Sequence, residues 1–225
     1  GVTPYLKGAG NYLVLIDMGK YRMGGSIFNK INGYLGSYDE HPTFNNIKNF
    51  HKLWKIIQTL VQDNRILSGH DRSDGGLMTT LIEMCISSHY GADIQITSPT
   101  SKNSYLFNEE LGLVLEISPN EYHNVIRLLC NQPYKVYKIG MTTDSTKFNI
   151  KYILRCIIWI PYIISNITIT LFFQKIKLNW LKNGNYQVMK WKGNNLHHNV
   201  PSQNLILLKN DANINIIYLR LCIIK

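Results

Sequence analysis

Residues 66–89 read ILSGHDRSDGGLMTTLIEMCISSH and place a short strand, a polar loop and a helix in immediate succession. Ile66 and Leu67 form the apolar strand, and the polar loop begins directly after them. The helix that follows ends near His89, and its apolar residues share one face at helical spacing: Leu77, Leu81, Met84 and Cys85. A strand that leads into a helix in this way indicates a domain in which helices pack on a sheet.

The same alternation extends through residues 1–150. Apolar or alternating runs predict further strands at 12–18, 92–96, 113–117, 134–139 and 148–152, and helical spacing predicts helices at 27–34, 46–62 and 121–130. The helix at 46–62, capped by Asn45 or Asn46, has the apolar stripe Ile47, Phe50, Trp54, Ile57 and Val61, which predicts a buried Trp54. The pattern predicts an α/β (α+β) domain at 1–150, with these helices packed on one mixed sheet.

Charge divides the chain after this domain. The 225 residues carry a net charge of +10, but residues 1–149 hold 14 basic and 13 acidic side chains, whereas residues 150–225 hold 10 basic ones and the single acid Asp211. Residues 151–173 are an apolar insertion in which the alternation from Ile167 to Leu171 favours a strand over a membrane span. Residues 174–225 are expected to form a basic helix near 178–192 and a linker.

The four cysteines form no CxxC pair and have no histidine at zinc-finger spacing. Cys85 and Cys130 lie among apolar residues of helices, so we expect both to be buried free thiols in a reducing compartment. The opening residues Gly1 to Pro4 lack the basic and apolar regions of a signal peptide, so none is expected.

The loop before the helix at 77–89 concentrates groups that bind phosphate and metal ions. Asp71 and Asp74 are hard oxygen ligands suited to Mg²⁺, Ser73 can hydrogen-bond a phosphate oxygen, and Gly75-Gly76 opens a helix start whose N–H groups favour anions. An equally good alternative is structural: Asp74 or Ser73 caps the helix and the two glycines form the turn. The chemistry of the loop does not decide between these two interpretations.

Two other segments carry weaker signals. Residues 106–112 read LFNEELG, which favours a short helix closed by Gly112 as a C-cap. Residues 23–26 read MGGS, a candidate anion-binding nest that is better explained as the entry to the helix at 27–34.

Taken together, these segments resemble the phosphoribosylformylglycinamidine synthase family. The opening VTPYLK and LIDMGK are similar to the family's VTPDLK and LIDLGK, RMGGS is similar to RLGGS, and HDRSDGGL and LFNEELG match family segments without a mismatch. The order and spacing are the family's over 1–140, and the likeness is weaker over 174–215, whereas residues 153–164 match no family segment.

The resemblance implies a fold like the C-terminal domain of aminoimidazole ribonucleotide synthetase. It further implies that Asp71 is a Mg²⁺ ligand and that Ser73 contacts ATP or ADP, in a site whose other ligands lie in a partner lobe. The family is an ATP-dependent carbon–nitrogen ligase of the glutamine amidotransferase type, which amidates formylglycinamide ribonucleotide in cytoplasmic purine synthesis. Ammonia from glutamine reaches a synthetase centre where ATP activates the formyl amide.

No catalytic residue of that reaction is expected in this chain. Cys130 lies at a helix end and lacks the glycine-flanked elbow of a glutaminase nucleophile. The resemblance therefore implies a fragment or split piece, whose partners are the other synthetase lobes and the glutaminase domain.

Three alternatives remain open. A stand-alone lobe of the same superfamily is disfavoured by LFNEELG, and a non-catalytic relic would have the same sequence as a split subunit. The third is a nucleic-acid-binding protein that uses residues 150–225, where basic and aromatic residues interleave: Lys175, Lys177, Trp180, Lys182, Tyr186, Lys190, Trp191 and Lys192. We expect neither a specific nucleic acid nor a membrane as a partner.

Overall fold

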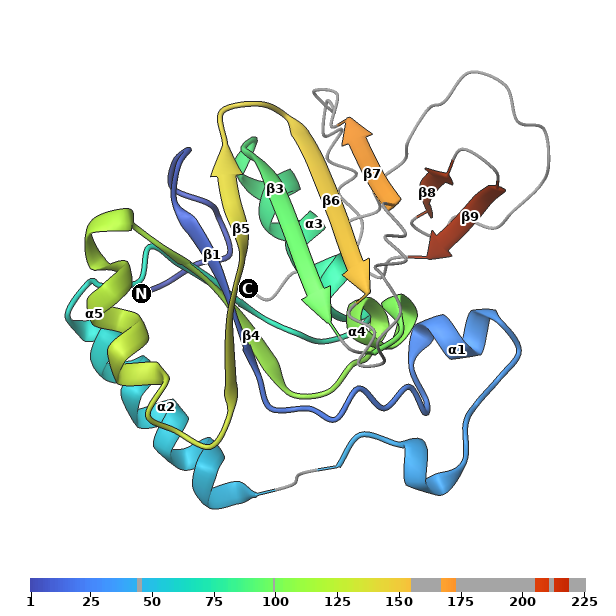
Figure 1. Ribbon diagram of the computed structural model, residues 1–225, viewed down its shortest axis with the longest axis horizontal. Coiled ribbons are helices and arrows are strands. Elements are labelled where there is room, and N and C mark those ends of the chain that lie inside the picture. Colours follow the sequence, from blue (N-terminus) through green and yellow to red (C-terminus); the bar gives the residue numbers. More distant parts are fainter. Residues whose placement is uncertain (44–45, 99, 155–166, 173–204, 211–212, 219–225) are drawn as a thin grey trace, which may run out of the picture.

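A computed structural model describes residues 1–43, 46–98, 100–154, 167–172, 205–210 and 213–218 (Figure 1). The elements follow in the order β1 (Tyr12–Asp17), α1 (Ile27–Ile31), the 3₁₀ helix η1 (Tyr38–Glu40), α2 (Ile47–Gln62), β2 (Ser68–Asp71), α3 (Gly76–Ser88), β3 (Gly91–Ser98), α4 (Lys102–Phe107), β4 (Gly112–Ile117), α5 (Pro119–Leu129), β5 (Lys135–Thr143), β6 (Lys147–Leu154), β7 (Ile167–Phe172), β8 (Leu205–Asn210) and β9 (Asn213–Tyr218). The predicted alternation of strands and helices over 1–150 is confirmed.

Seven strands form one mixed sheet in the order β2-β4-β1-β5-β3-β6-β7. Its neighbouring strands are antiparallel except β3 and β6, which run parallel from the pair Ala92 and Phe148 to the pair Ser98 and Leu154. The predicted class, an α/β (α+β) fold with a mixed sheet and packed helices, is therefore correct.

Strand β1, which lies between β4 and β5, is buried on both faces. Leu13 and Leu15 point to the cluster built with α3 and α4, whereas Val14 and Ile16 point to the cluster built with α2 and α5. Figure 1 shows α2 and α5 at one side of the sheet, with α3 behind β3 and β6. An apolar run without alternation is typical of a strand covered on both faces, which explains why residues 12–18 lack a polar face.

Helix α2 packs with a different face from the one that its apolar stripe predicts. The buried residues are Leu53, Ile57 and Leu60, whereas Ile47 and Trp54 are 64% and 47% exposed. The prediction of a buried Trp54 is wrong, because the leucines at 53 and 60 share a face with Ile57 and align with the sheet. Of the two predicted capping residues, Asn46 is the N-cap. Its side chain accepts hydrogen bonds from Lys48 N and Asn49 N at 3.0 and 3.2 Å.

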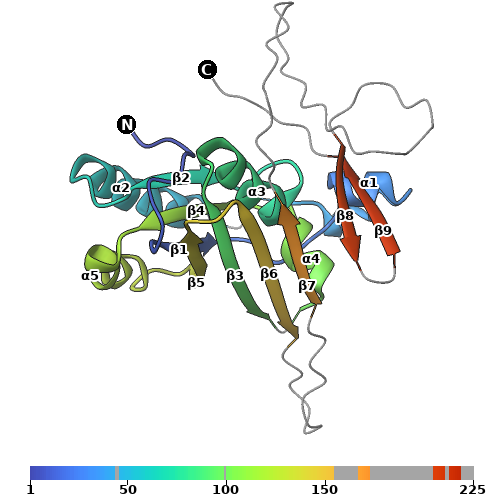
Figure 2. The same cartoon turned by 90° about the horizontal axis from the view of Figure 1, so that it is seen from above.

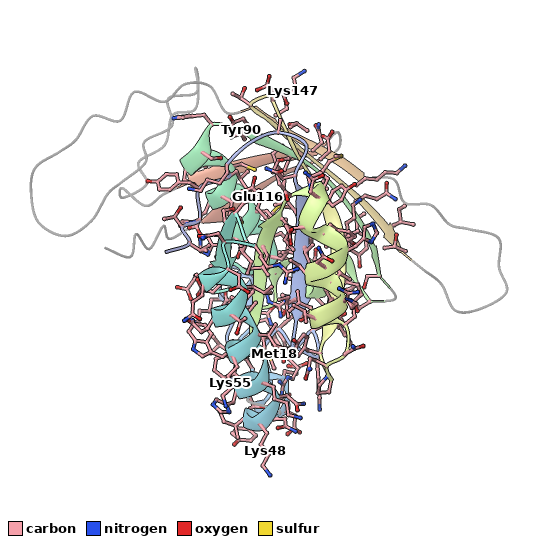
Figure 3. All side chains as sticks on the ribbon, turned by 90° about the vertical axis from the view of Figure 1, so that its left-hand side faces the viewer. Met18, Lys48, Lys55, Tyr90, Glu116 and Lys147 are labelled. Atoms are coloured by element: carbon pink, nitrogen blue, oxygen red, sulfur yellow. The ribbon has the colours of Figure 1, made fainter. Side chains whose placement is uncertain are left out.

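A buried carboxylate fixes the N-terminal segment to the sheet. Glu116 of β4 is fully buried, and its two oxygens accept hydrogen bonds from Lys7 N at 3.0 and 2.9 Å. Asn11 Nδ2 donates to the same carboxylate at 2.7 Å. Glu116 and Met18 lie at opposite ends of the central strands (Figure 3), so this anchor lies far from the loops that follow β1.

The segment after residue 150 only partly follows the sequence expectations. β7 pairs with β6 from Ile167 to Phe172, which confirms the predicted sheet-associated strand. Within the residues that the structure describes, no helix is long and apolar enough to cross a membrane. Strands β8 and β9 pair where a linker is predicted (Figure 2), because the alternation in Asn213–Tyr218 suits a strand. The helix expected near 178–192 lies outside the described residues.

Of the two cysteines expected to be buried, only one is. Cys85 in α3 is 1% exposed, and burial raises the pKa of its thiol to about 12. Cys130 is exposed at the end of α5, because Val125 and Leu129 supply the buried face of that helix. Both are free thiols.

Candidate functional site

An open pocket of about 700 Å³ lies where β1 ends and where β4 and β5 begin. From the end of β1, the chain passes below the sheet through α1 and η1 before it returns to the start of α2 (Figure 1). The wall of the pocket contains Asp17 and Lys135 from strand ends, Gly24 and Gly25 from the loop before α1, and Ser73 and Asp74 from the loop before α3. Segments that are distant in sequence therefore meet at one end of the sheet.

The structure separates the two residues that the sequence assigns to nucleotide and metal. Ser73 lies in the pocket wall, next to Asp74. Asp71 is the last residue of β2 and is not among the residues that line this pocket; its side chain is 58% exposed and its Oδ1 lies 3.3 Å from His70 Nδ1. β2 occupies Ser68–Asp71, later than the strand predicted at 66–67, because these residues pair with β4 from Glu116 to Leu113.

Helix α3 begins without a side-chain cap. Gly75 is the N-cap residue with φ of 80°, and neither Ser73 nor Asp74 caps the helix, so this part of the structural alternative is wrong. Its other part is correct, because Gly75 and Gly76 form the turn, in which Gly76 N donates to Ser73 O. Gly76 has φ of 70° and lies against the backbone of residues 106–108. A Cβ atom at this position would lie 2.7 Å from the carbonyl oxygens of Leu106 and Asn108. Glycine is therefore required at position 76 by both conformation and space.

The carboxylate of Glu109 takes the place of the missing cap. Its Oε1 accepts hydrogen bonds from Gly75 N and from Ile27 N, each at 2.8 Å. Burial raises the pKa of Glu109, although these two backbone hydrogen bonds act in the opposite direction. The start of α1 is capped in addition by Ser26, whose Oγ accepts from Asn29 N at 3.2 Å. The structure thus confirms MGGS as a helix entry.

The neighbouring Glu110 holds the loop after β1. Its side chain is buried, forms an ion pair with Arg22 and accepts hydrogen bonds from Lys20 N and Arg22 N. The sequence predicts a short helix with Gly112 as its C-cap; a short helix is present, but the predicted cap is wrong. Helix α4 ends with Asn108 as its C-cap, and Gly112 is the first residue of β4. The signal that this interpretation missed is the adjacent pair Glu109 and Glu110, whose carboxylates bind the backbone of neighbouring loops.

Arg72 faces the protein interior from the middle of an exposed loop. Its Nη2 lies 2.7 Å from Asp17 Oδ1, and both side chains are at most 1% exposed. Arg72 also donates to the carbonyl oxygens of Glu110 and Leu111, at 2.6 and 3.1 Å. These bonds tie the loop before α3 to the end of β1 and to the segment before β4, and so fix the backbone that carries Ser73.

His70 joins β2 to α3. Its Nε2 lies 3.0 Å from Glu83 Oε2, and its Nδ1 faces Asp71. Burial alone lowers the pKa of His70, but the hydrogen bond to Glu83 and the charges of Glu83 and Asp71 outweigh burial and raise that pKa. Among the residues that the structure describes, no three His, Cys, Asp or Glu side chains gather to form a metal site.

The domain is thus a mixed sheet with helices on both faces and with glycine- and carboxylate-rich loops at one end. Solved structures with this fold include Thermotoga maritima PurL complexed with FGAR, with a TM-score of 0.57, 13% identity and coverage of 67% of this chain and 27% of that chain. The complex of Thermotoga maritima PurL with ATP gives a TM-score of 0.51 at 13% identity, covering 67% of this chain and 24% of that one.

Residues 8–153 match the family model described as AIR synthase related protein, C-terminal domain, and the chain belongs to this family. Phosphoribosylformylglycinamidine synthase of Schizosaccharomyces pombe is 40% identical over 145 residues, which cover 62% of this chain and 11% of the relative. A probable chloroplastic/mitochondrial phosphoribosylformylglycinamidine synthase of Arabidopsis thaliana is 34% identical over 155 residues, which cover 67% of this chain. The chain spans 11% of the length of each of these two relatives.

Proposed function

We propose that this chain forms a C-terminal lobe of the synthetase core of phosphoribosylformylglycinamidine synthase. As part of that enzyme, it contributes to the ATP- and glutamine-dependent amidation of formylglycinamide ribonucleotide. The observation that carries the proposal is the 40% identity over 145 residues to a relative of that name, in the part of the chain that matches the family model. The nucleic-acid alternative is not favoured, because these matches account for the folded domain and give the basic region no role.

We assign to Ser73 a contact with ATP or ADP and to Asp71 the role of a Mg²⁺ ligand. The position of Ser73 in the pocket wall, beside a glycine-opened helix start, supports the first assignment. The exposed carboxylate of Asp71 at the end of β2 supports the second. Mg²⁺ requires about six ligands, of which the loop offers the oxygens of Asp71 and Asp74, so most of the set has to come from water, the nucleotide and another lobe.

In this proposal, the residues of this chain bind the nucleotide and position the loop that contacts it. Arg72 holds the loop that carries Ser73 through its ion pair with Asp17 and its bonds to two carbonyl groups. When bound, Mg²⁺ would neutralise phosphate charge beside this loop. We assign no catalytic residue to the chain. Its partners are the other synthetase lobes and the glutaminase domain, which supplies ammonia from glutamine.

We further propose the division into a synthetase-lobe domain at 1–150, an apolar insertion and strand at 151–173, and a basic region at 174–225. A cytoplasmic location stays a prediction, and the Arabidopsis thaliana relative is named as chloroplastic/mitochondrial.

Calorimetric titration of ATP, with and without Mg²⁺, tests the site. We expect weak or undetectable binding by this chain alone, and Mg²⁺-dependent binding when the partner lobe is supplied. Asp71→Asn keeps the shape of the side chain but removes its charge, so it should weaken the Mg²⁺-dependent part of the binding. Tight Mg²⁺-ATP binding by the isolated chain that Asp71→Asn leaves unchanged would show that the site is elsewhere.

A further inference from the structure

The two helix starts that flank the pocket are joined by one oxygen atom. Glu109 Oε1 lies 2.8 Å from both Gly75 N, at the start of α3, and Ile27 N, at the start of α1. Glu109 itself, with Gly25 and Ser73, lines the pocket. The carboxylate therefore sits between the loop before α3 and the loop before α1.

The backbone on each side of this bridge is packed too closely to shift freely. A Cβ atom at Gly76 would lie 2.7 Å from Asn108 O, and one at Gly24 would lie 2.7 Å from Glu40 O. Phe28 of α1 stacks on Phe107 of α4 with ring centroids 4.7 Å apart. These contacts hold each helix in place by packing, so changes at Glu109 should leave the domain folded while they release the hydrogen bonds between the two loops.

We propose that Glu109 is a positioning residue of the pocket. It fixes the start of α3 to the start of α1, so that a ligand that contacts Ser73 meets both loops in one preformed arrangement. The inference rests on the proposed nucleotide function. Burial penalises the charged form of Glu109, and the two backbone hydrogen bonds offset this penalty. This balance is consistent with a carboxylate whose role is to hold two backbone segments together.

Two conservative variants of Glu109 separate the effect of side-chain length from the effect of charge. Glu109→Gln keeps the length of the side chain and an oxygen that accepts both N–H bonds, but it removes the charge. Glu109→Asp keeps the charge but is one methylene shorter, so it cannot accept from Gly75 N and Ile27 N together. Glu121→Asp is the matched control, because Glu121 of α5 accepts a hydrogen bond from Arg65 and does not line this pocket.

The first measurement is the affinity of Mg²⁺-ADP for the chain combined with its partner lobe. We expect Glu109→Asp to weaken binding about tenfold, the effect of losing a hydrogen bond to a charged group, and Glu109→Gln to stay within about threefold of the original chain. Glu121→Asp should have no effect. Equal affinities for the original chain and its Glu109→Asp variant, or a larger loss with Glu109→Gln, would overturn the positioning role.

The second measurement needs no nucleotide and distinguishes this inference from the proposed function. Amide hydrogen exchange at Gly75 and Ile27 is followed by NMR in the chain alone. We expect Glu109→Asp to accelerate exchange at both amides at once, and Glu109→Gln to leave both protected. If only one amide responds, or neither, the bridge does not exist and the inference fails. If both respond but the original chain with its partner lobe binds no nucleotide, the bridge stands and the proposed function fails.

Discussion

The buried ion pair between Arg72 and Asp17 is the residue-scale feature on which the candidate site depends most. Both side chains are at most 1% exposed, and Asp17 also accepts a hydrogen bond from Gly19 N at 3.0 Å. Removing one partner of a buried ion pair costs far more than removing one of a surface pair, because the remaining charge stays buried without compensation.

Arg72→Met should therefore lower the free energy of unfolding by about 3–5 kcal/mol, since it leaves the Asp17 carboxylate buried and unpaired. The matched control is Arg65→Met, which removes a half-exposed ion pair with Glu121 and should cost about 1 kcal/mol or less. Urea unfolding of the two variants provides the comparison. Similar costs for both would contradict a buried charge pair at Arg72.

Trp54 provides a second comparison between neighbouring residues. Because Trp54 is 47% exposed and Leu53 is 2% exposed, we expect Trp54→Ala to cost about 1 kcal/mol or less and Leu53→Ala about 2–5 kcal/mol. Thermal unfolding of the two variants measures the difference. A greater loss with Trp54→Ala would mean that α2 packs with the face that its apolar stripe predicts.

At the scale of elements, the start of α3 depends on close approach between two backbones. Gly76 and Gly33 have nearly the same φ, 70° and 72°, but a Cβ atom at Gly33 would meet nothing within 4 Å. The two positions therefore separate backbone strain from steric clash.

Gly33→Ala should cost about 1–2 kcal/mol, which is the strain of a left-handed conformation alone. Gly76→Ala should cost clearly more, because its methyl group would press on the carbonyl oxygens of Leu106 and Asn108. The free energies of unfolding of the two variants test this. Equal costs would show that the segment from 106 to 108 can retreat from α3.

The link between β2 and α3 should make stability depend on pH. The carboxylates of Glu83 and Asp71 raise the pKa of His70 above its ordinary value of 6.5 despite burial. Because the pKa of His70 is raised in the folded state, protonated His70 stabilises the fold fully at pH values below about 6.5, its pKa in the unfolded chain. This stabilisation is lost as the pH rises through the pKa of the folded state.

Glu83→Gln removes the charge that faces His70 Nε2, so the variant should be less stable than the original chain at pH 5.5 and should approach it by pH 8.5. Chemical unfolding across this pH range measures the difference. A gap between the two proteins that stays constant with pH would mean that His70 does not titrate against Glu83.

At the scale of the whole molecule, the two apolar clusters share strands of the sheet, among them β1. Leu15 and Ile16 of β1 are both fully buried, but they face opposite clusters. Neither cluster can therefore lose β1 without exposing the other, which favours cooperative unfolding of the domain.

We expect α2 and α3, which cover opposite faces, to lose protection at the same urea concentration. Hydrogen exchange measured by mass spectrometry at increasing urea follows both helices in one experiment. Separate midpoints for α2 and α3 would show that the two clusters unfold independently, despite the strands that they share.

Local sequence information was enough to predict the fold class, the order of the elements over 1–150 and the family. These follow from apolar periodicity, glycine turns and contiguous segments such as HDRSDGGL and LFNEELG. The same information identified the loop that carries Ser73. Such features are readable because each depends on residues that are neighbours in the chain.

The side chains that hold that loop became evident only in the folded chain. Arg72 pairs with Asp17, and Glu109 bridges Gly75 and Ile27, across separations that no local pattern records. The burial of Leu53 beside an exposed Trp54 is likewise a result of packing. The physical reason is the same in each case: burial and ion pairing depend on which elements meet in space, and that is settled by the packing of the whole sheet.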